Sequence, residues 1–399
     1  MNRKTLHAVN GGRLMRYVSC CQEARTMLQL KRGFALFAVV MLCVLGASGV
    51  QAQEKATLSI INFDGYSEEE WVKPFEEKYN CEVKITTAGT VEEHFTKVKA
   101  APNEYNIVSI DSGRVKLYQD SGLIQPIDVS KLSNYNKIGE FFREHPYAKT
   151  ESGQKLHVPI VWGTQTITIN TARVPEEKLA PYLSEDGKTV SLDILTAPEF
   201  QGEIAFFDES TNVVSIAAIH LGLDDPFHFE EGDWEKVQQR LYEWKSNART
   251  FTTGLDSEFG VLTGEDAYVV LGGNDALLNL RLEEAGMREN FTQYAMTEGT
   301  ISWIDGWVIT APTEGRSLEL AHAYIDYMIG DQGQEQLARL VGFGIVNPAG
   351  SGGFNPVVLD SAWWYAEDIG EFPAPLYIMV PEEDPGKRVE LWNRVKAMP

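Results

Sequence analysis

Two indole side chains and a carboxylate lie within five residues of one another, at Trp303, Asp305 and Trp307. In an extended chain, alternate side chains point the same way, so these three would share one face. A carboxylate between aromatic faces suits an organic cation, because the charge meets the acid while the carbon atoms lie on indole. The cation–π part of that attraction is on the order of 0.5–2 kcal/mol. On this segment alone, a buried strand whose tryptophans fill the core remains the competing interpretation.

The beginning of the chain's globular part predicts alternating strands and helices. Alternating apolar residues predict a first strand over 56–63, and Ser67 with Glu70 fits a capping box that would begin a helix. A strand over 81–86, a helix over 91–100 and a strand over 105–111 follow. This β-α-β-α-β order predicts a parallel sheet whose ligands bind beyond the carboxyl ends of its strands.

The rest of the chain predicts a second domain built in the same way. Residues 113–128 are expected to form a helix that leads into a short edge strand. The β-rich segment 157–170 is interrupted by Gly163, which we interpret as the point where the chain leaves the first domain. Further helices are expected over 191–200, 213–221, 233–247, 256–265, 276–285 and 318–329, and further strands over 202–207, 267–271 and 292–297. The segment 299–307 would be the return crossing.

Polar and aromatic residues follow several of these strands and define a candidate binding site. They are Asp64, Tyr66, Asp111, Ser112, Trp162, Thr164, residues 208–212, Asn274, Asp275, Trp303 and Asp305. Acids and aromatic residues dominate, and Arg114 is the only base in these loops. A pocket for an anion would want donors and helix N-termini free of acids, so the pattern favours a cationic ligand held between two domains.

No catalytic signature accompanies this pattern. The sequence has no G-x-S-x-G motif and no P-loop. Paired acids such as Asp208 and Glu209 leave a secreted hydrolase as an alternative, but no second acid cluster stands at a defined separation. With seven histidines and no HExxH motif, a zinc site is not expected.

Composition and the first fifty residues predict an exported protein. A basic lead-in, an apolar run over 34–44 and the A-x-A-like end Val50-Gln51-Ala52 indicate a signal peptide cleaved after Ala52, with Met27 as a possible true start. The formal net charge of −22 argues against nucleic acid as a partner and favours cationic ligands. Three of the four cysteines lie in this leader, which leaves Cys81 and therefore no intrachain disulfide.

Six short segments, in order along residues 56–348, resemble the periplasmic solute-binding proteins of polyamine ABC transporters, the spermidine/putrescine-binding type. These segments are Asn62-Phe-Asp-Gly-Tyr66, Tyr105-Asn-Ile-Val followed by Gly122-Leu-Ile-Gln-Pro-Ile-Asp128, Val158-Pro-Ile-Val-Trp-Gly-Thr164, Phe200-Gln-Gly-Glu-Ile204, Glu298-Gly-Thr-Ile-Ser-Trp-Ile-Asp305 and Gly342-Phe-Gly-Ile-Val-Asn-Pro348. The resemblance implies an α/β, two-lobed periplasmic-binding-protein fold of type II, with mixed sheets, flanking helices and a ligand cleft between the lobes. It also implies an inner-membrane ABC permease as partner.

Carried over residue by residue, the resemblance gives Trp303 and Asp305 the role of holding the cation. Tyr66 matches an aromatic residue at the end of the first strand, and Phe63 stands where the family usually has Trp. Gly272 replaces the tryptophan of the family's Trp-Asn-Gly-Asp turn, which would leave room in the site.

Two more departures concern the acids. Of two acids three residues apart in the family, Glu209 is kept and Asn212 is neutral here, and the usual Ser/Tyr pattern near residue 110 is altered. A diamine needs an anion at each end, because a buried unpaired ammonium costs several kcal/mol. A ligand with one cationic end would suit this site, whether amine, zwitterion or amino-acid-like solute. Asp111 could instead restore the second anion and keep a polyamine as the ligand.

The combined expectation is a periplasmic, non-enzymatic solute-binding protein that acts without cofactor or metal. It would be a monomer that binds a small cationic, polyamine-like solute. Residues 1–52 would be the leader, 54–163 with 304–346 the first lobe, and 164–303 with 347–399 the second lobe. The expected ligand contacts are Phe63, Asp64, Tyr66, Asp111, Ser112, Trp162, Thr164, Glu209, Asn212, Asn274, Asp275, Trp303 and Asp305.

Overall fold

The structure is a computed structural model, and it describes residues 55–63, 65–89, 91–145, 147–272, 275–353 and 372–398. The expected leader and its cleavage site therefore lie outside the described residues, as do Asp64 and Asn274. Asp275 is described only as the first residue of a helix.

The first sheet has the strand order β13-β5-β12-β3-β1-β2, with β4 and β14 also paired to β12. Its strands are β1 (Ala56–Asn62), β2 (Cys81–Thr87), β3 (Ile107–Asp111), β4 (Ile124–Gln125), β5 (Val158–Thr164), β12 (Thr300–Thr310), β13 (Gly344–Ile345) and β14 (Leu376–Ile378). β1 runs parallel to β2 and β3, so the predicted parallel start of the sheet is confirmed. The long strand β12 lies antiparallel between β3 and β5.

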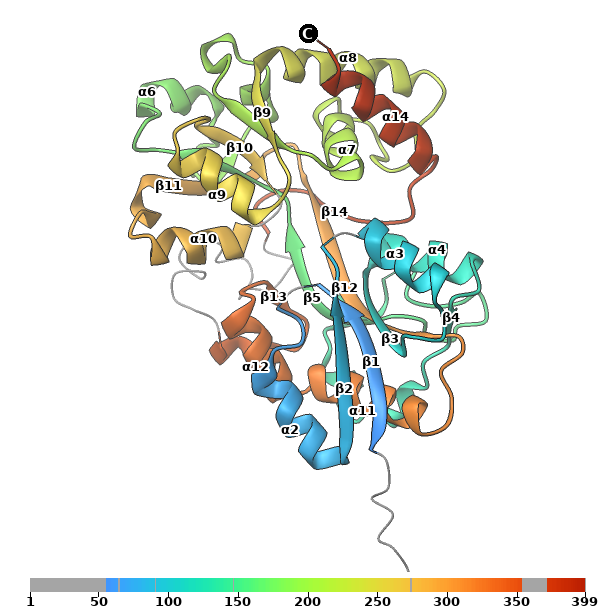
Figure 1. Cartoon of the computed structure of the whole chain (residues 1–399). Helices are drawn as coiled ribbons and strands as arrows, with labels where there is room; N and C mark the ends of the chain where they lie inside the picture. Colours follow the sequence, from blue (N-terminus) through green and yellow to red (C-terminus); the bar gives the residue numbers. More distant parts are fainter. Residues whose placement is uncertain are drawn as a thin grey trace, which may run out of the picture. The chain divides into compact units, whose positions relative to one another are not determined.

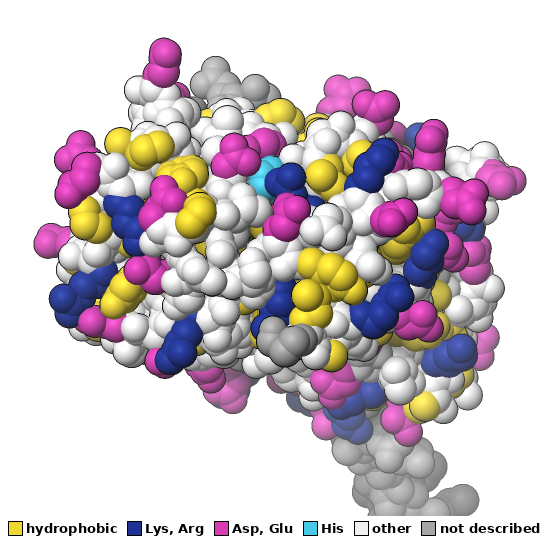
Figure 2. Space-filling model, turned by 90° about the horizontal axis from the view of Figure 1, so that it is seen from above, with side chains coloured by type: hydrophobic (Ala, Val, Ile, Leu, Met, Phe, Trp, Pro, Cys, Tyr) yellow, Lys and Arg dark blue, Asp and Glu magenta, His cyan; other side chains and the backbone are white. Residues whose placement is uncertain are grey.

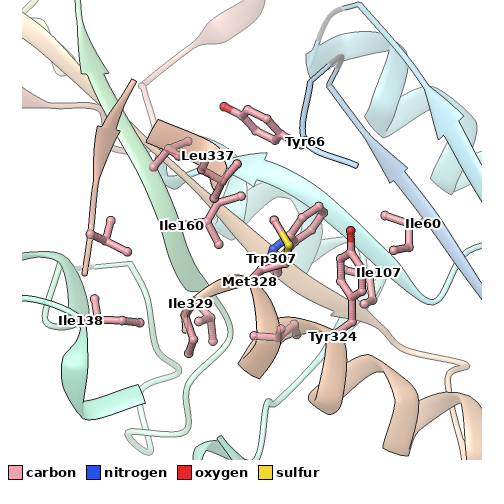
Figure 3. Packing of buried hydrophobic residues seen from close by; sticks show 14 of the residues in the cluster. Ile60, Tyr66, Ile107, Ile138, Ile160, Trp307, Tyr324, Met328, Ile329 and Leu337 are labelled. Carbon is pink, nitrogen blue, oxygen red and sulfur yellow. The ribbon is translucent and has the colours of Figure 1, made fainter. Parts of the chain in front are cut away.

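Helices cover both faces of this sheet (Figure 1). On one face lie α2 (Glu69–Tyr79), α11 (Gly315–Met328) and α12 (Asp331–Leu340), whose apolar residues share a core with Trp307. On the other lie α3 (Val91–Ala100) and α4 (Val115–Asp120). In Figure 3, Trp307 lies among the labelled apolar side chains beside Met328, and Tyr66 lies at their edge. Trp307 is thus a core residue with no exposed surface.

The second sheet has the order β7-β11-β6-β10-β8-β9. Its strands are β6 (Thr166–Asn170), β7 (Thr189–Val190), β8 (Ile204–Phe207), β9 (Ala248–Thr252), β10 (Val269–Gly272) and β11 (Phe291–Met296). Its helices are α6 (Glu176–Leu179), α7 (Ser210–His220), α8 (Asp233–Asn247), α9 (Leu255–Thr263), α10 (Asp275–Glu284) and α14 (Pro385–Lys396). The short helix α5 (Glu140–Arg143) packs on the first sheet through Phe142. Figure 1 shows α14 beside α7 and α8.

The chain passes between the sheets at two places. It leaves the first sheet at Gln165, between β5 and β6, and it returns between β11 and β12. The C-terminal residues contact both sheets, because β14 pairs with β12 while Leu391 and Trp392 of α14 join the core of the second sheet.

Three predicted local structures are wrong. The helix expected over 113–128 ends at Asp120, since the chain turns at Gly122, where φ is +66°, into β4. Residues 191–200 form two short 3-10 helices, Leu192–Leu195 and Pro198–Phe200, because a proline interrupts the segment. Ser67 does not cap α2. Its hydroxyl instead bonds Asn62 and lies 3.0 Å from the Tyr324 hydroxyl.

Within the described part of the chain, no helix combines the length and apolar character needed to cross a bilayer. Figure 2 shows acidic side chains scattered among basic and apolar ones over one face of the molecule. On that face, the acidic side chains are therefore interspersed with basic ones rather than gathered in one patch.

Candidate functional site

Asp305, in the middle of β12, is a buried carboxylate with a neutral partner. Its side chain belongs to a residue that is only 7% exposed, and Tyr66 donates its phenolic hydrogen to Oδ2 at 2.7 Å. Burial raises the pKa of Asp305 to about 7, the nearby charge of Asp111 adds to this, and the Tyr66 hydrogen bond opposes it. Burial also raises the pKa of Tyr66 well above its usual value. The predicted residues Tyr66 and Asp305 are thus in direct contact.

Asp111 lies directly opposite Asp305 in the pairing of β3 with β12. Side chains opposite one another in an antiparallel pair share a face of the sheet and lie close together. Asp111 accepts a hydrogen bond from the Gly113 amide at 2.8 Å, and burial raises its pKa. The next residue, Ser112, is fully buried and donates to the Met379 carbonyl at 2.8 Å.

Two aromatic residues that are close in sequence to Asp305 and Tyr66 each pack against another ring. Trp303 is partly buried and meets the ring of Phe343 edge to face, with 4.7 Å between centroids. Phe63 meets Tyr66 edge to face at 5.9 Å and lies 4.3 Å from the ring of His94. Tyr66 therefore connects Phe63 with Asp305.

Glycine at 163 is what lets the Trp303 indole lie on the backbone of β5. Trp303 is paired with Gly163, and a Cβ added there would fall 2.1 Å from the indole. Trp162 lies against the backbone of β13 in the same way. It is paired with Gly344, and a Cβ added to Gly344 would fall 2.4 Å from the Trp162 Nε1. Gly163 therefore does not interrupt the segment, as the sequence suggested, because it lies within β5 and the chain leaves the first sheet two residues later, at Gln165.

Trp162 and Thr164 are both in β5 and both buried. Trp162 belongs to the core of the first sheet, where its ring packs against Phe142. Thr164 is paired with Ser302 across the strands, one position before the chain leaves this sheet. Their expected contact with ligand stays a prediction.

Glu209 caps the N-terminus of α7. It accepts hydrogen bonds from the amides of Thr211 at 3.3 Å and Asn212 at 2.8 Å. Burial raises the pKa of Glu209 to about 7, and the Asn212 amide and Arg114 oppose the shift. Asn212 is 8% exposed, and its Oδ1 finds no hydrogen-bond partner among the described residues.

Arg114 and Glu382 are charged residues that the sequence did not assign to the site. The Arg114 guanidinium lies 3.2 Å from Glu382, 3.4 Å from Glu92 and 4.0 Å from Asp111. These carboxylates raise the pKa of Arg114 against the effect of burial. The only sequence signal was that Arg114 is the one base among acidic loops. Glu382 gave no signal, because it lies in the C-terminal segment far from the motifs.

The room expected at Gly272 is not there, and that prediction is wrong. A Cβ on Gly272 would fall 3.1 Å from both carboxylate oxygens of Glu258, a fully buried residue of α9. The space is filled by an acid from another element, which no local pattern announced. Neither Asn274 nor the side chain of Asp275 is described here.

The described residues contain no group of three or more His, Cys, Asp and Glu side chains placed to hold a metal ion. Around Asp305 the structure places buried carboxylates, hydroxyls and aromatic rings. Such groups bind an organic cation, with the carboxylate meeting its charge and the rings its carbon atoms.

Residues 70–351 match the sequence profile of a family described as bacterial extracellular solute-binding protein. The chain belongs to this family. The match runs from α2 into the segment that follows β13, so it covers every strand of the second sheet and all strands of the first sheet except β1 and β14.

Proteins with a similar sequence include the putrescine/cadaverine-binding protein of Pseudomonas aeruginosa. It is 22% identical over 317 residues, which cover 78% of this chain and 85% of that protein. The spermidine/putrescine-binding periplasmic protein of Escherichia coli K12 is 22% identical over 332 residues, covering 81% and 87%.

A crystal structure of a spermidine/putrescine transporter substrate-binding protein from Streptococcus pneumoniae superposes with a TM-score of 0.69 at 22% identity. The alignment covers 86% of this chain and 99% of that one. The chain thus has the two-lobed fold of periplasmic binding proteins, as the sequence predicted.

Proposed function

We propose that this protein is the periplasmic solute-binding component of an ABC importer and that it binds a small cationic amine of the polyamine class. The observation that carries the proposal is Asp305, a buried carboxylate that receives a hydrogen bond from Tyr66 and has no cationic side chain as a contact among the described residues. An ionised carboxylate in such a place is costly unless a charge pairs with it. A ligand ammonium would supply that charge.

The names of the relatives support the same class of ligand. Proteins that bind putrescine, cadaverine and spermidine align with more than two thirds of this chain. The role we propose is transport without catalysis, with a membrane permease as the partner and a monomer as the working form. Export to the periplasm would follow from the leader, with cleavage after Ala52.

The ligand would lie between two lobes, and we propose residues 54–163 with 304–346 as the first and 164–303 with 347–399 as the second. Strands β5 and β12 carry Trp162, Thr164, Trp303 and Asp305 next to the two places where the chain passes between the sheets. Binding there would favour the closed arrangement of the lobes, because the ligand contacts both only when they are together.

An amine with a single charge, a zwitterion or an amino-acid-like solute is the second candidate. It is favoured by Glu209, whose oxygens already accept two backbone hydrogen bonds, and by the neutral Asn212. Both candidates use Asp305 for the cationic end of the ligand, and they differ in what the other end meets.

The test is titration calorimetry of the exported protein, freed of bound solute by unfolding and refolding. The panel contains spermidine, putrescine, cadaverine, mono-amines and cationic and neutral amino acids. Binding of at least one cationic amine supports the proposal, and binding of neutral or anionic solutes alone refutes it. Mass spectrometry of the solute that copurifies from cells names the ligand, and N-terminal sequencing of the exported protein checks cleavage after Ala52.

A further inference from the structure

Arg114 brings a positive charge from within the chain into the acidic region beside Asp305. Its guanidinium bonds Glu382 at 3.2 Å and also donates to the Thr211 hydroxyl at 3.4 Å. Thr211 in turn donates to Glu382 at 3.0 Å, so the three side chains form one connected group. The Arg114 side chain is only 14% exposed, which keeps these interactions away from solvent screening.

The same guanidinium faces Asp111, the acid opposite Asp305. Its Nε lies 4.0 Å from Asp111 Oδ2. Asp111 is next to Asp305 because the two residues pair directly where β3 runs antiparallel to β12. The two adjacent acids are therefore unequal. Asp111 has a cation nearby in the protein, whereas Asp305 accepts its hydrogen bond from the neutral Tyr66 phenol.

We propose that Arg114 is a specificity-determining residue. It supplies the charge for Asp111 and Glu382, so that this end of the site takes one ligand ammonium, at Asp305. The inference rests on the proposed function, because it concerns how many charges of a cationic amine the site can hold. A second ammonium placed beside Asp111 would meet the guanidinium and be repelled.

Glu382 is shared with a second arginine, which limits what the removal of Arg114 would expose. Arg388 is fully buried, with Nε 3.8 Å from Glu382 Oε2, and it also donates to Ser215 and to the Phe227 carbonyl. Replacing Arg114 therefore leaves Glu382 paired with Arg388, whereas Asp111 keeps no ion pair with a described residue. Asp111 is the acid that would become available to a second ammonium.

The experiment compares two ligands that differ in one charge, putrescine and 4-amino-1-butanol, by titration calorimetry. The measured quantity is the ratio of their affinities in the wild type and in Arg114→Gln. We expect the ratio to move toward putrescine by about ten- to a hundredfold in the variant, the range for a hydrogen bond between charged groups. An unchanged ratio overturns the inference.

Lys116→Gln is the matched control, because it removes the same charge two residues away. Lys116 is exposed and pairs with Asp120 on the surface of α4. If this variant shifts the ratio as much as Arg114→Gln does, the effect is one of net charge and the inference is wrong. Arg114→Lys keeps the charge, and we expect its ratio to stay near that of the wild type.

Glu382→Gln should change the affinity ratio in the opposite direction. This variant also provides a test if Arg114→Gln does not fold. It leaves Arg114 with one carboxylate fewer, so the ratio should move away from putrescine. A ratio equal to that of the wild type contradicts the inference. If the wild type binds no cationic amine, the proposed function itself fails, and the two failures are thereby distinguished.

Discussion

Asp305 and Asp111 face each other across adjacent antiparallel strands, one with a phenol as its hydrogen-bond partner and the other with a guanidinium nearby. Two like charges so placed destabilise each other unless something offsets them. Burial raises the pKa of both carboxyl groups above the usual value. The two groups therefore ionise most readily when a cation binds beside them. A ligand ammonium and this acidic pair would thus stabilise each other.

Removing the charge of Asp305 should weaken the binding of a cationic ligand. In Asp305→Asn, we expect a loss of about 1.5–3 kcal/mol, the range for a hydrogen bond to a charged group. Calorimetry with the best amine of the panel measures it. Asp120→Asn, which changes an exposed carboxylate paired with Lys116, is the control and should bind as the wild type does. Equal affinity in Asp305→Asn would remove this residue from the site.

Binding should release a proton below neutral pH. The unbound Asp305 holds its proton up to about pH 7, and an ammonium ligand requires the carboxylate, so affinity should fall as the pH drops below about 7, by up to about tenfold per pH unit. Calorimetry at pH 6 in two buffers of different ionisation enthalpy detects the proton. Identical heats in the two buffers would contradict the prediction, and Asp305→Asn should show a smaller difference than the wild type.

The same pKa makes a stability prediction for the ligand-free protein. Between about pH 4 and 7, the folded protein holds a proton on Asp305 that the unfolded chain releases, so this group's stabilising contribution is lost as the pH rises through 7. Relative to the wild type, Asp305→Asn should therefore gain stability over that interval. Urea unfolding of both proteins at pH 4.5 and 7.5 checks the sign, and a constant difference would show that the carboxyl is not shifted.

Gly163→Ala should displace the Trp303 indole. The added methyl group would lie far inside contact distance of the ring, and overpacking of this kind costs about 1–3 kcal/mol. Thermal unfolding measures the cost, and calorimetry shows whether amine affinity falls with it. Gly89→Ala adds the same atom where nothing lies within 4 Å, so it should leave both unchanged. A Gly163→Ala protein with unaltered stability would disprove the contact.

Gly272 and Glu258 should be energetically coupled. A methyl group at Gly272 forces the carboxylate to move, at a cost of about 1 kcal/mol or more, and this cost should shrink in the Glu258→Ala background, where the acid is gone. The double-mutant cycle is measured by urea unfolding, with coupling of at least about 0.5 kcal/mol expected. Additive effects of the two substitutions would refute it.

Local sequence patterns predicted the strands and the motif on β12. They did not predict which residues from distant parts of the chain lie next to each other. Alternating apolar residues located β1, β3 and β11 to within two residues at each end. The register that sets Asp305 opposite Asp111 joins segments far apart in sequence, and no local pattern encodes it. For the same reason, Glu258 at Gly272 and Glu382 at Arg114 became visible only in the structure.

The order of the strands along the chain has a kinetic consequence. β5 and β12 are neighbours in the first sheet, yet all strands of the second sheet lie between them in sequence. Contacts between residues so distant form slowly, because a long loop must close before they are gained. The second sheet shortens that loop when it folds, since β6 and β11 pair with each other and bring the ends of β5 and β12 together. We therefore expect the inserted segment to fold before β12, the strand that carries Asp305, pairs with β5.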